Sequence, residues 1–244
     1  MSPEPETPAA PMSEPARLAN VLLEPKKAFA DIAQRPRPWA PLLLVIVAAI
    51  VFVACFTQRV GWERFMRQQL ETNRRTQQLT PEQRERALAM QMKIAPVMGY
   101  VGPAVSVPVM ALVIAGVLLL TGKMVGSGAN FKQMFGITAY SFVPGVINSA
   151  AGIAVMFLKN PDEFNLQNPT AFNAGAFLDP ETTSKAVMSV AGSIDLFTIW
   201  SMILMAIGIS AASRRVTAGK ALPAVVIPWL LWIAVKAAWA GIMG

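Results

Sequence analysis

Histidine is absent from the 244 residues of this chain, and cysteine occurs once, as Cys55. The absence of histidine removes the commonest general base and the commonest metal-ligating side chain. A single cysteine excludes an intrachain disulfide and a metal cluster held by several cysteines. We therefore expect no catalytic residue, no metal and no cofactor, and the composition argues against an enzyme.

Charge is also scarce: charged residues make up 14% of the chain, against about 25% in a soluble domain. No charge occurs in residues 38–58, 94–122 or 133–158, and residues 186–213 and 221–244 hold only Asp195 and Lys236 respectively. About 20 apolar residues are needed to cross a hydrocarbon core of about 30 Å. The sequence predicts an all-α, polytopic membrane helix bundle with five transmembrane helices, at about residues 38–57, 95–121, 132–157, 186–211 and 221–243. The chain has too few polar segments to cover five such helices as a soluble protein.

The N-terminal region divides into two parts. Residues 1–15 are rich in proline and acidic, without the apolar run of a secretory signal, and we expect a disordered tail ahead of one membrane domain at 16–244. In residues 16–37, apolar side chains recur on either side of Pro25 and predict two short amphipathic helices: Leu18, Leu22, Phe29 and Ile32. Such a segment lies in the membrane interface or packs on the protein's own loops.

Residues 58–94 form the long polar stretch between predicted spans. Thr80, Pro81 and Gln83 make a helix start, in which Thr80 caps and Gln83 reaches back to the cap. We expect two helices, at about 60–78 and 81–95, that lie outside the membrane and do not form a sixth span.

The distribution of basic residues predicts the orientation. Arginine and lysine tend to remain on the cytoplasmic side. With the N-terminus inside, the turns after the second and fourth spans are cytoplasmic and basic, and the acidic loop 159–184 is outside. The C-terminus is then periplasmic or extracellular. The loop 58–93, with eight basic and four acidic residues, conflicts with this rule, although long loops obey it less well.

The net charge of +7 does not indicate nucleic-acid binding, because no basic patch lies on a soluble domain. It fits loops that face anionic lipid headgroups, so the lipid bilayer is the expected partner. The glycine-rich turn at 122–128 does not match a phosphate-binding loop, since Gly122-Lys123 is followed by Met124.

Several stretches in order resemble the Yip1 domain family, in its bacterial branch. They are Leu22-Leu23-Glu24-Pro25 with Phe29 and Ile32, Trp39-Ala40-Pro41-Leu42, Phe131-Lys132-Gln133 followed by Tyr140 and Pro144, and Asp195-Leu196-Phe197-Thr198-Ile199-Trp200 followed by Gly208. The resemblance covers about residues 17–242. It implies a five-span protein of the bacterial cytoplasmic (inner) membrane with a cytoplasmic N-terminus. Eukaryotic relatives are associated with Golgi and endoplasmic-reticulum membranes, Rab-type GTPases and vesicle traffic, but this role does not transfer residue by residue.

Two functional hypotheses from different classes follow. The first is a non-enzymatic membrane-organising scaffold that binds membrane or cytoplasmic proteins through its N-terminal segment and loops. The second is a transporter or channel for a small solute or lipid, which broken helices and buried charge would support. An intramembrane enzyme is disfavoured, because serine–histidine chemistry needs histidine and an aspartate pair needs two carboxylates within the spans.

The two isolated intramembrane charges suggest a pair. Asp195 and Lys236 lie about equally far from the turn that joins the last two spans, so they are expected at similar depth. We predict a salt bridge or a water-linked pair between them. The alternatives are a Lys236 side chain that reaches the headgroups, an Asp195 carboxylate bonded to backbone or to Ser193 or Thr198, and an ion or proton site at Asp195.

Overall fold

The computed structural model describes residues 11–72, 79–161, 164, 166, 168–179, 182–213 and 215–243. In this part of the chain the structure is helical, with one isolated β-bridge between Asn173 and Asp195. The helices are α1 (Glu14–Leu23), α2 (Pro25–Gln34), α3 (Trp39–Arg59), α4 (Trp62–Thr72), α6 (Pro81–Met124), α7 (Phe131–Ser141), α8 (Pro144–Leu158), the 3-10 helix η2 (Ala174–Phe177), α9 (Lys185–Ser193), α10 (Leu196–Ala211) and α11 (Ala218–Met243). The all-α prediction is confirmed. The tail predicted for residues 1–15 lies outside the described part at residues 1–10. It is wrong at its end, because Ser13 caps α1 and Glu14 begins this helix.

Four stretches are long and apolar enough to cross a membrane: α3, α6, the α7–α8 stretch and α11. A fifth apolar helix, α10, has 16 residues and is therefore about 24 Å long, short of a 30 Å hydrocarbon core. The prediction of a polytopic membrane bundle is confirmed. Of the five predicted spans, four correspond to full-length apolar stretches and the fourth in chain order corresponds to the shorter helix α10.

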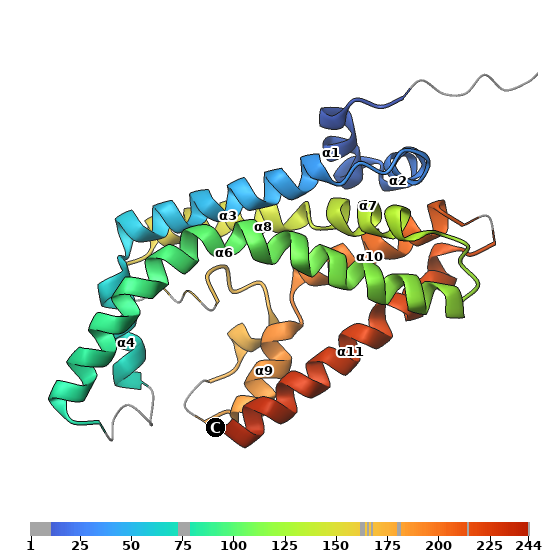
Figure 1. Cartoon of the computed structure of the whole chain (residues 1–244). Coiled ribbons are helices and arrows are strands. Elements are labelled where there is room, and N and C mark those ends of the chain that lie inside the picture. The colour runs from blue at the N-terminus through green and yellow to red at the C-terminus, as the bar shows by residue number, and fades with distance from the viewer. Residues whose placement is uncertain are drawn as a thin grey trace, which may run out of the picture.

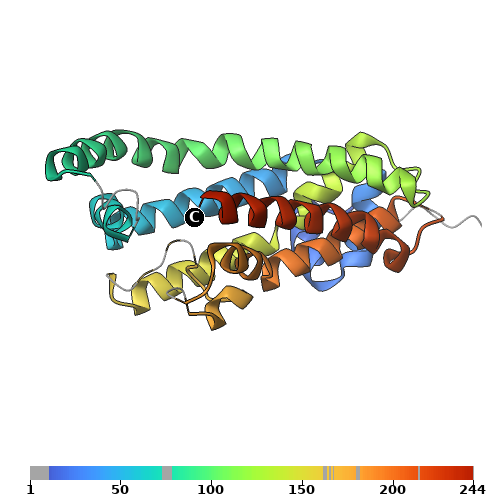
Figure 2. The same cartoon turned by 90° about the horizontal axis from the view of Figure 1, so that it is seen from below.

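The bundle is elongated, and its two ends differ (Figures 1 and 2). The hairpin of α1 and α2 covers one end, which we call the hairpin end. At the other end, α4 and the first turns of α6 form an arm that extends beyond the bundle, and we call this the arm end. The chain runs back and forth between them, so the last residues of α11 lie away from the hairpin (Figure 1).

The arm and the second span share one helix. Thr80 and Gln83 form the predicted capping box at its start. From Pro81 the helix continues for 44 residues through three internal prolines. Residues 81–95 are therefore helical as predicted, but they run directly into the second span. At the other edge of the arm, Gly61 separates α3 from α4. Its φ of +83° is a left-handed conformation, which glycine adopts easily and which is strained for residues with a Cβ atom.

Two predicted spans are interrupted. Pro144 occupies the first turn of α8 and ends α7 at Ser141, since proline lacks the N–H that would continue a helix. The fourth span breaks at residues 194–195, between α9 and α10. There Ile194 O accepts from Ala174 N at 3.0 Å and Leu196 N donates to Phe172 O at 3.0 Å. The preceding loop thus satisfies the backbone groups of the break, as apolar surroundings require.

Candidate functional site: a buried ion network beneath the N-terminal hairpin

The α1–α2 hairpin is built by a proline. Pro25 takes the first position of α2 directly after Glu24, and Ser13 caps α1 with its side chain. The apolar residues Val21, Phe29 and Ile32 are fully buried. Each helix has only 10 residues, and isolated helices of that length are marginal in water. Tertiary packing must therefore hold the hairpin in its helical form.

The hairpin packs on the bundle through close contacts at glycines. A Cβ atom built on Gly208 of α10 would lie 2.4 Å from Ile137 of α7 and 3.0 Å from Phe29 of α2. Gln133 at the start of α7 donates a hydrogen bond to Ala33 O at 2.9 Å. Three helices therefore meet where only glycine fits.

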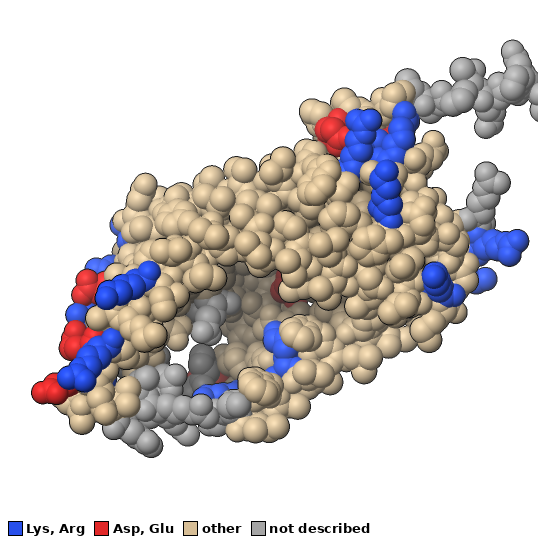
Figure 3. All heavy atoms as spheres, viewed as in Figure 1, with Lys and Arg blue, Asp and Glu red and all other residues tan. Residues whose placement is uncertain are grey.

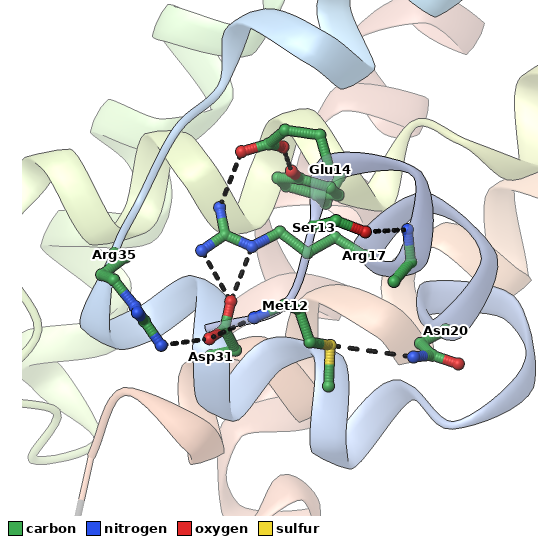
Figure 4. Close-up of polar contacts among 9 residues, drawn as sticks. Met12, Ser13, Glu14, Arg17, Asn20, Asp31 and Arg35 are labelled. Carbon is green, nitrogen blue, oxygen red and sulfur yellow. Dashed lines mark hydrogen bonds and ion pairs between the residues drawn. The ribbon is translucent and has the colours of Figure 1, made fainter. Parts of the chain in front are cut away.

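The hairpin contains a buried arginine. Arg17 of α1 is 2% exposed, and its Nε and Nη2 atoms both lie 2.6 Å from Asp31 Oδ2 of α2. Its Nη1 atom lies 3.1 Å from Glu14 Oε1. The guanidinium thus joins both helices of the hairpin through charge-assisted bonds (Figure 4).

Further partners complete what we call the ion network, namely Glu14, Arg17, Asp31, Arg35 and Tyr140. Asp31 Oδ1 accepts from Arg35 Nη2 at 2.7 Å and from the Met12 backbone N–H at 3.4 Å. The hydroxyl of Tyr140, a fully buried residue of α7, donates to the other carboxylate oxygen of Glu14. Two carboxylates face two guanidinium groups, so the network is neutral, and Tyr140 ties it to the bundle.

The charges of the ion network stabilise one another. Burial by itself would lower the pKa of Arg17, but the oxygen atoms of Tyr140, Asp31 and Glu14 raise it above the ordinary value. Burial would likewise raise the pKa of Asp31, whereas Arg17, the Met12 N–H and Arg35 hold it below its usual range. Both groups are therefore charged at neutral pH, and the network acts as a clamp between hairpin and bundle.

The comparisons with known proteins fit this architecture. The Yip1 domain matches residues 19–240, which is nearly the whole chain after the tail. The chain belongs to the Yip1 domain family. It is also 28% identical over 198 residues to the membrane protein YknW of Bacillus subtilis, a match that covers 81% of this chain and 78% of YknW. No solved structure matches it.

The Yip1-like motif positions fall in several places. Phe29 and Tyr140 share the buried core beside the hairpin, and Pro25 begins α2. Pro144 begins α8, and Trp200 of α10 packs on the same core. Trp39, at the start of α3, is 67% exposed, which suits a headgroup-level ring.

Sequence reasoning missed Glu14, Arg17, Asp31 and Arg35 of the ion network. Local signals were present: Asp31 and Arg35 are four residues apart, the spacing of a helical ion pair. Glu14 and Arg17 are likewise three residues apart on α1. The bond from Arg17 to Asp31 joins two helices, and Tyr140 bonds Glu14 from α7, so no spacing along the chain indicates these contacts.

The predicted salt bridge between Asp195 and Lys236 is not formed. Asp195 Oδ1 caps α10 by accepting from Phe197 N at 3.0 Å and Thr198 N at 2.9 Å. Lys236 Nζ donates to Ser193 Oγ at 2.8 Å. The depth estimate was sound, since Lys236 reaches a residue two positions from Asp195. No salt bridge forms because the helix breaks there and the free N–H groups of α10 attract the carboxylate, which matches the alternative of a carboxylate bonded to backbone. A water-linked pair stays a prediction.

Proposed function

We propose that this Yip1 family protein is a non-enzymatic, partner-binding organiser of a bacterial cytoplasmic membrane. Its docking surface is the α1–α2 hairpin, which faces the cytoplasm. The observation that supports this most strongly is the ion network: a buried, fully paired cluster that holds a short hairpin in one position. A fixed surface binds a partner without the ordering cost that a free peptide incurs.

The outer surface of the hairpin end is basic. Lys27 and Glu24 form an exposed pair, and Leu23 is 78% exposed. Basic side chains at this end stand out against a largely uncharged middle (Figure 3). The exposed ones in the described chain are Lys26, Lys27, Arg37, Lys123, Lys132, Arg215 and Lys220. Such a surface suits an acidic protein partner held close to anionic headgroups.

Site-specific photo-crosslinking in cells tests the proposal. A photoreactive residue at Lys27 of the full-length protein should give discrete protein adducts, and the adducts should weaken in the Arg17→Met background. The matched control carries the same residue at Val105, 60% exposed on α6, and should give no protein adduct. Adducts that are identical from both positions, or unaffected by Arg17→Met, would contradict a hairpin docking surface.

A second candidate is a transporter or channel for a small solute or lipid. The observation that favours it is the break between α9 and α10, because discontinuous helices form many transport sites. A flux assay in proteoliposomes separates the two functions: a scaffold leaves the vesicle content unchanged, and a transporter releases or accumulates its solute.

A further inference from the structure

A hollow opens on the face of the molecule between α6 and the pair α9–α11 (Figure 3, viewed as Figure 1). The α11 helix leaves the bundle at an angle, and α9 packs against it on the side of the hollow (Figure 1). Gly241 near the end of α11 lies beside Ala186 at the start of α9. These two helices therefore form one wall of the hollow, on the side of the molecule nearer the arm end.

Lys236 is the charged residue of α11 on this wall. It lies 18 positions after the first residue of the helix, Ala218, or about 27 Å along its axis. This depth places the ammonium in the leaflet at the arm end. The side chain is partly buried. Among the described residues, its polar contact is the hydrogen bond to Ser193.

Lys236 forms no ion pair with any residue of the described chain. Ser193 uses its own proton in a bond to Ser189 O at 2.8 Å, so it offers Lys236 a lone pair but no charge. Asp195 Oδ1 accepts from the first N–H groups of α10, and among the described residues no ion pair joins Asp195 to Lys236. An ammonium has three donors, and a lone charge at membrane depth requires a counter-charge.

The face of α11 beside Lys236 has the character of a headgroup site. Trp232, Val235 and Trp239 share this side of the helix by their spacing, and they are 61%, 60% and 64% exposed. Tryptophan prefers the level of lipid headgroups. A lysine flanked by two exposed indole rings therefore combines a cation for a phosphate with apolar surface for acyl chains.

We propose that Lys236 binds the phosphate of an anionic phospholipid, which enters from the leaflet at the arm end and lies along α11. Ser193 orients the ammonium, and the lipid supplies the missing negative charge. This lipid site is independent of the hairpin: its failure leaves the proposed docking function intact, and the reverse also holds.

Native mass spectrometry of the full-length protein in detergent tests this site, with phosphatidylglycerol as the added probe. Lys236→Gln keeps a polar partner for Ser193 and removes the charge. It should reduce the retained phosphatidylglycerol about tenfold, the effect of losing one charge-assisted contact, whereas Lys236→Arg should retain it. The matched control is Lys185→Gln, an exposed lysine at the far end of α9, and it should bind as the wild type does.

Two further arms separate the outcomes. Inorganic phosphate in excess should not displace the lipid; displacement would identify free phosphate as the ligand and overturn the lipid proposal. Zwitterionic phosphatidylcholine should be retained more weakly than phosphatidylglycerol. The lipid proposal would also be overturned if wild type and Lys236→Gln retained phosphatidylglycerol equally, or if Lys185→Gln lost as much of it as Lys236→Gln does. If Lys236→Gln fails to fold, the comparison of wild type with Lys236→Arg tests the site. Loss of phosphatidylglycerol from the arginine variant, which keeps the positive charge, would contradict a charge-based site.

Discussion

At the scale of single residues, the unusual feature is an arginine with 2% of its surface exposed in a hairpin of only two short helices. A buried guanidinium is tolerated when opposite charges surround it and every donor finds a partner. Among the described residues, no buried side-chain nitrogen or oxygen lacks a hydrogen-bond partner. The ion network therefore stabilises the docked hairpin only while it is complete.

Removing one member of the buried pair should be costly. Arg17→Met and Asp31→Asn should each destabilise the hairpin by about 3 kcal/mol, because each leaves a buried charge uncompensated. The double variant should lose less than the sum of the two. Thermal unfolding in detergent measures this cycle. Lys27→Met, in the exposed pair with Glu24, is the control and should cost less than about 1 kcal/mol. Strictly additive losses would contradict the pairing.

The acid dependence follows from Asp31. Its pKa in the folded protein is lower than its ordinary value, which is about 3.9 in a free chain. The ionised carboxylate therefore stabilises the fold at all pH values above about 4, and this contribution is lost as the pH falls further, through the folded pKa. We expect the difference in melting temperature between wild type and Asp31→Asn to stay constant from about pH 8 to pH 5 and to shrink below about pH 4. A difference that already closes near pH 6 would indicate a raised pKa instead.

At the scale of helices, sequence patterns predicted the helix starts and breaks whose interacting residues lie within one helical turn. The cap at Thr80 and the break at Pro25 depend on residues within one turn, and both were predictable. The break between α9 and α10 was not, because its backbone partners Phe172 and Ala174 come from the preceding loop. The salt bridge of Asp195 and Lys236 was expected on the assumption of one straight span.

The contact at Gly208 should tolerate no side chain. Gly208→Ala should destabilise the protein by about 1–3 kcal/mol, because its Cβ would overlap Ile137 and force the hairpin outward. Gly102→Ala is the matched control: it makes the same change within α6, where a Cβ atom meets nothing within 4 Å. It should be neutral or stabilising by up to about 1 kcal/mol. Melting temperatures of both variants decide this, and equal shifts would show that the Gly208 contact is not tight.

A proline in α11 should depend on a threonine in α6. Pro228 cannot donate to Ala224 O, and Thr121 Oγ1 instead donates to that carbonyl at 2.8 Å. Thr121→Val should therefore cost about 1 kcal/mol, and clearly less in a Pro228→Ala background, where the helix N–H is restored. Thr121→Ser keeps the hydroxyl and should be close to the wild type. Unfolding in detergent measures the coupling, and an equal cost in both backgrounds would rule it out.

At the scale of the whole molecule, the distribution of charge along the chain was sufficient to predict a membrane helix bundle. The charge-poor stretches correspond to α3, most of α6, the α7–α8 stretch and α11. The position of the hairpin was not predictable in the same way. Its amphipathic pattern fits a membrane surface as well as a protein surface, and the choice depends on Tyr140 and Gly208, more than 100 positions away along the chain.

Hydrogen exchange of the backbone amides of α1 and α2, in the full-length protein in lipid nanodiscs, tests most directly whether the ion network holds the hairpin on the bundle. In the wild type these amides should exchange slowly, and Arg17→Met should accelerate them about 100-fold, the equivalent of about 3 kcal/mol. Amides of α3 should be unaffected and serve as the internal control. Rapid exchange of α1 and α2 in the wild type, or protection that persists unchanged in Arg17→Met, would contradict a hairpin clamped by the ion network.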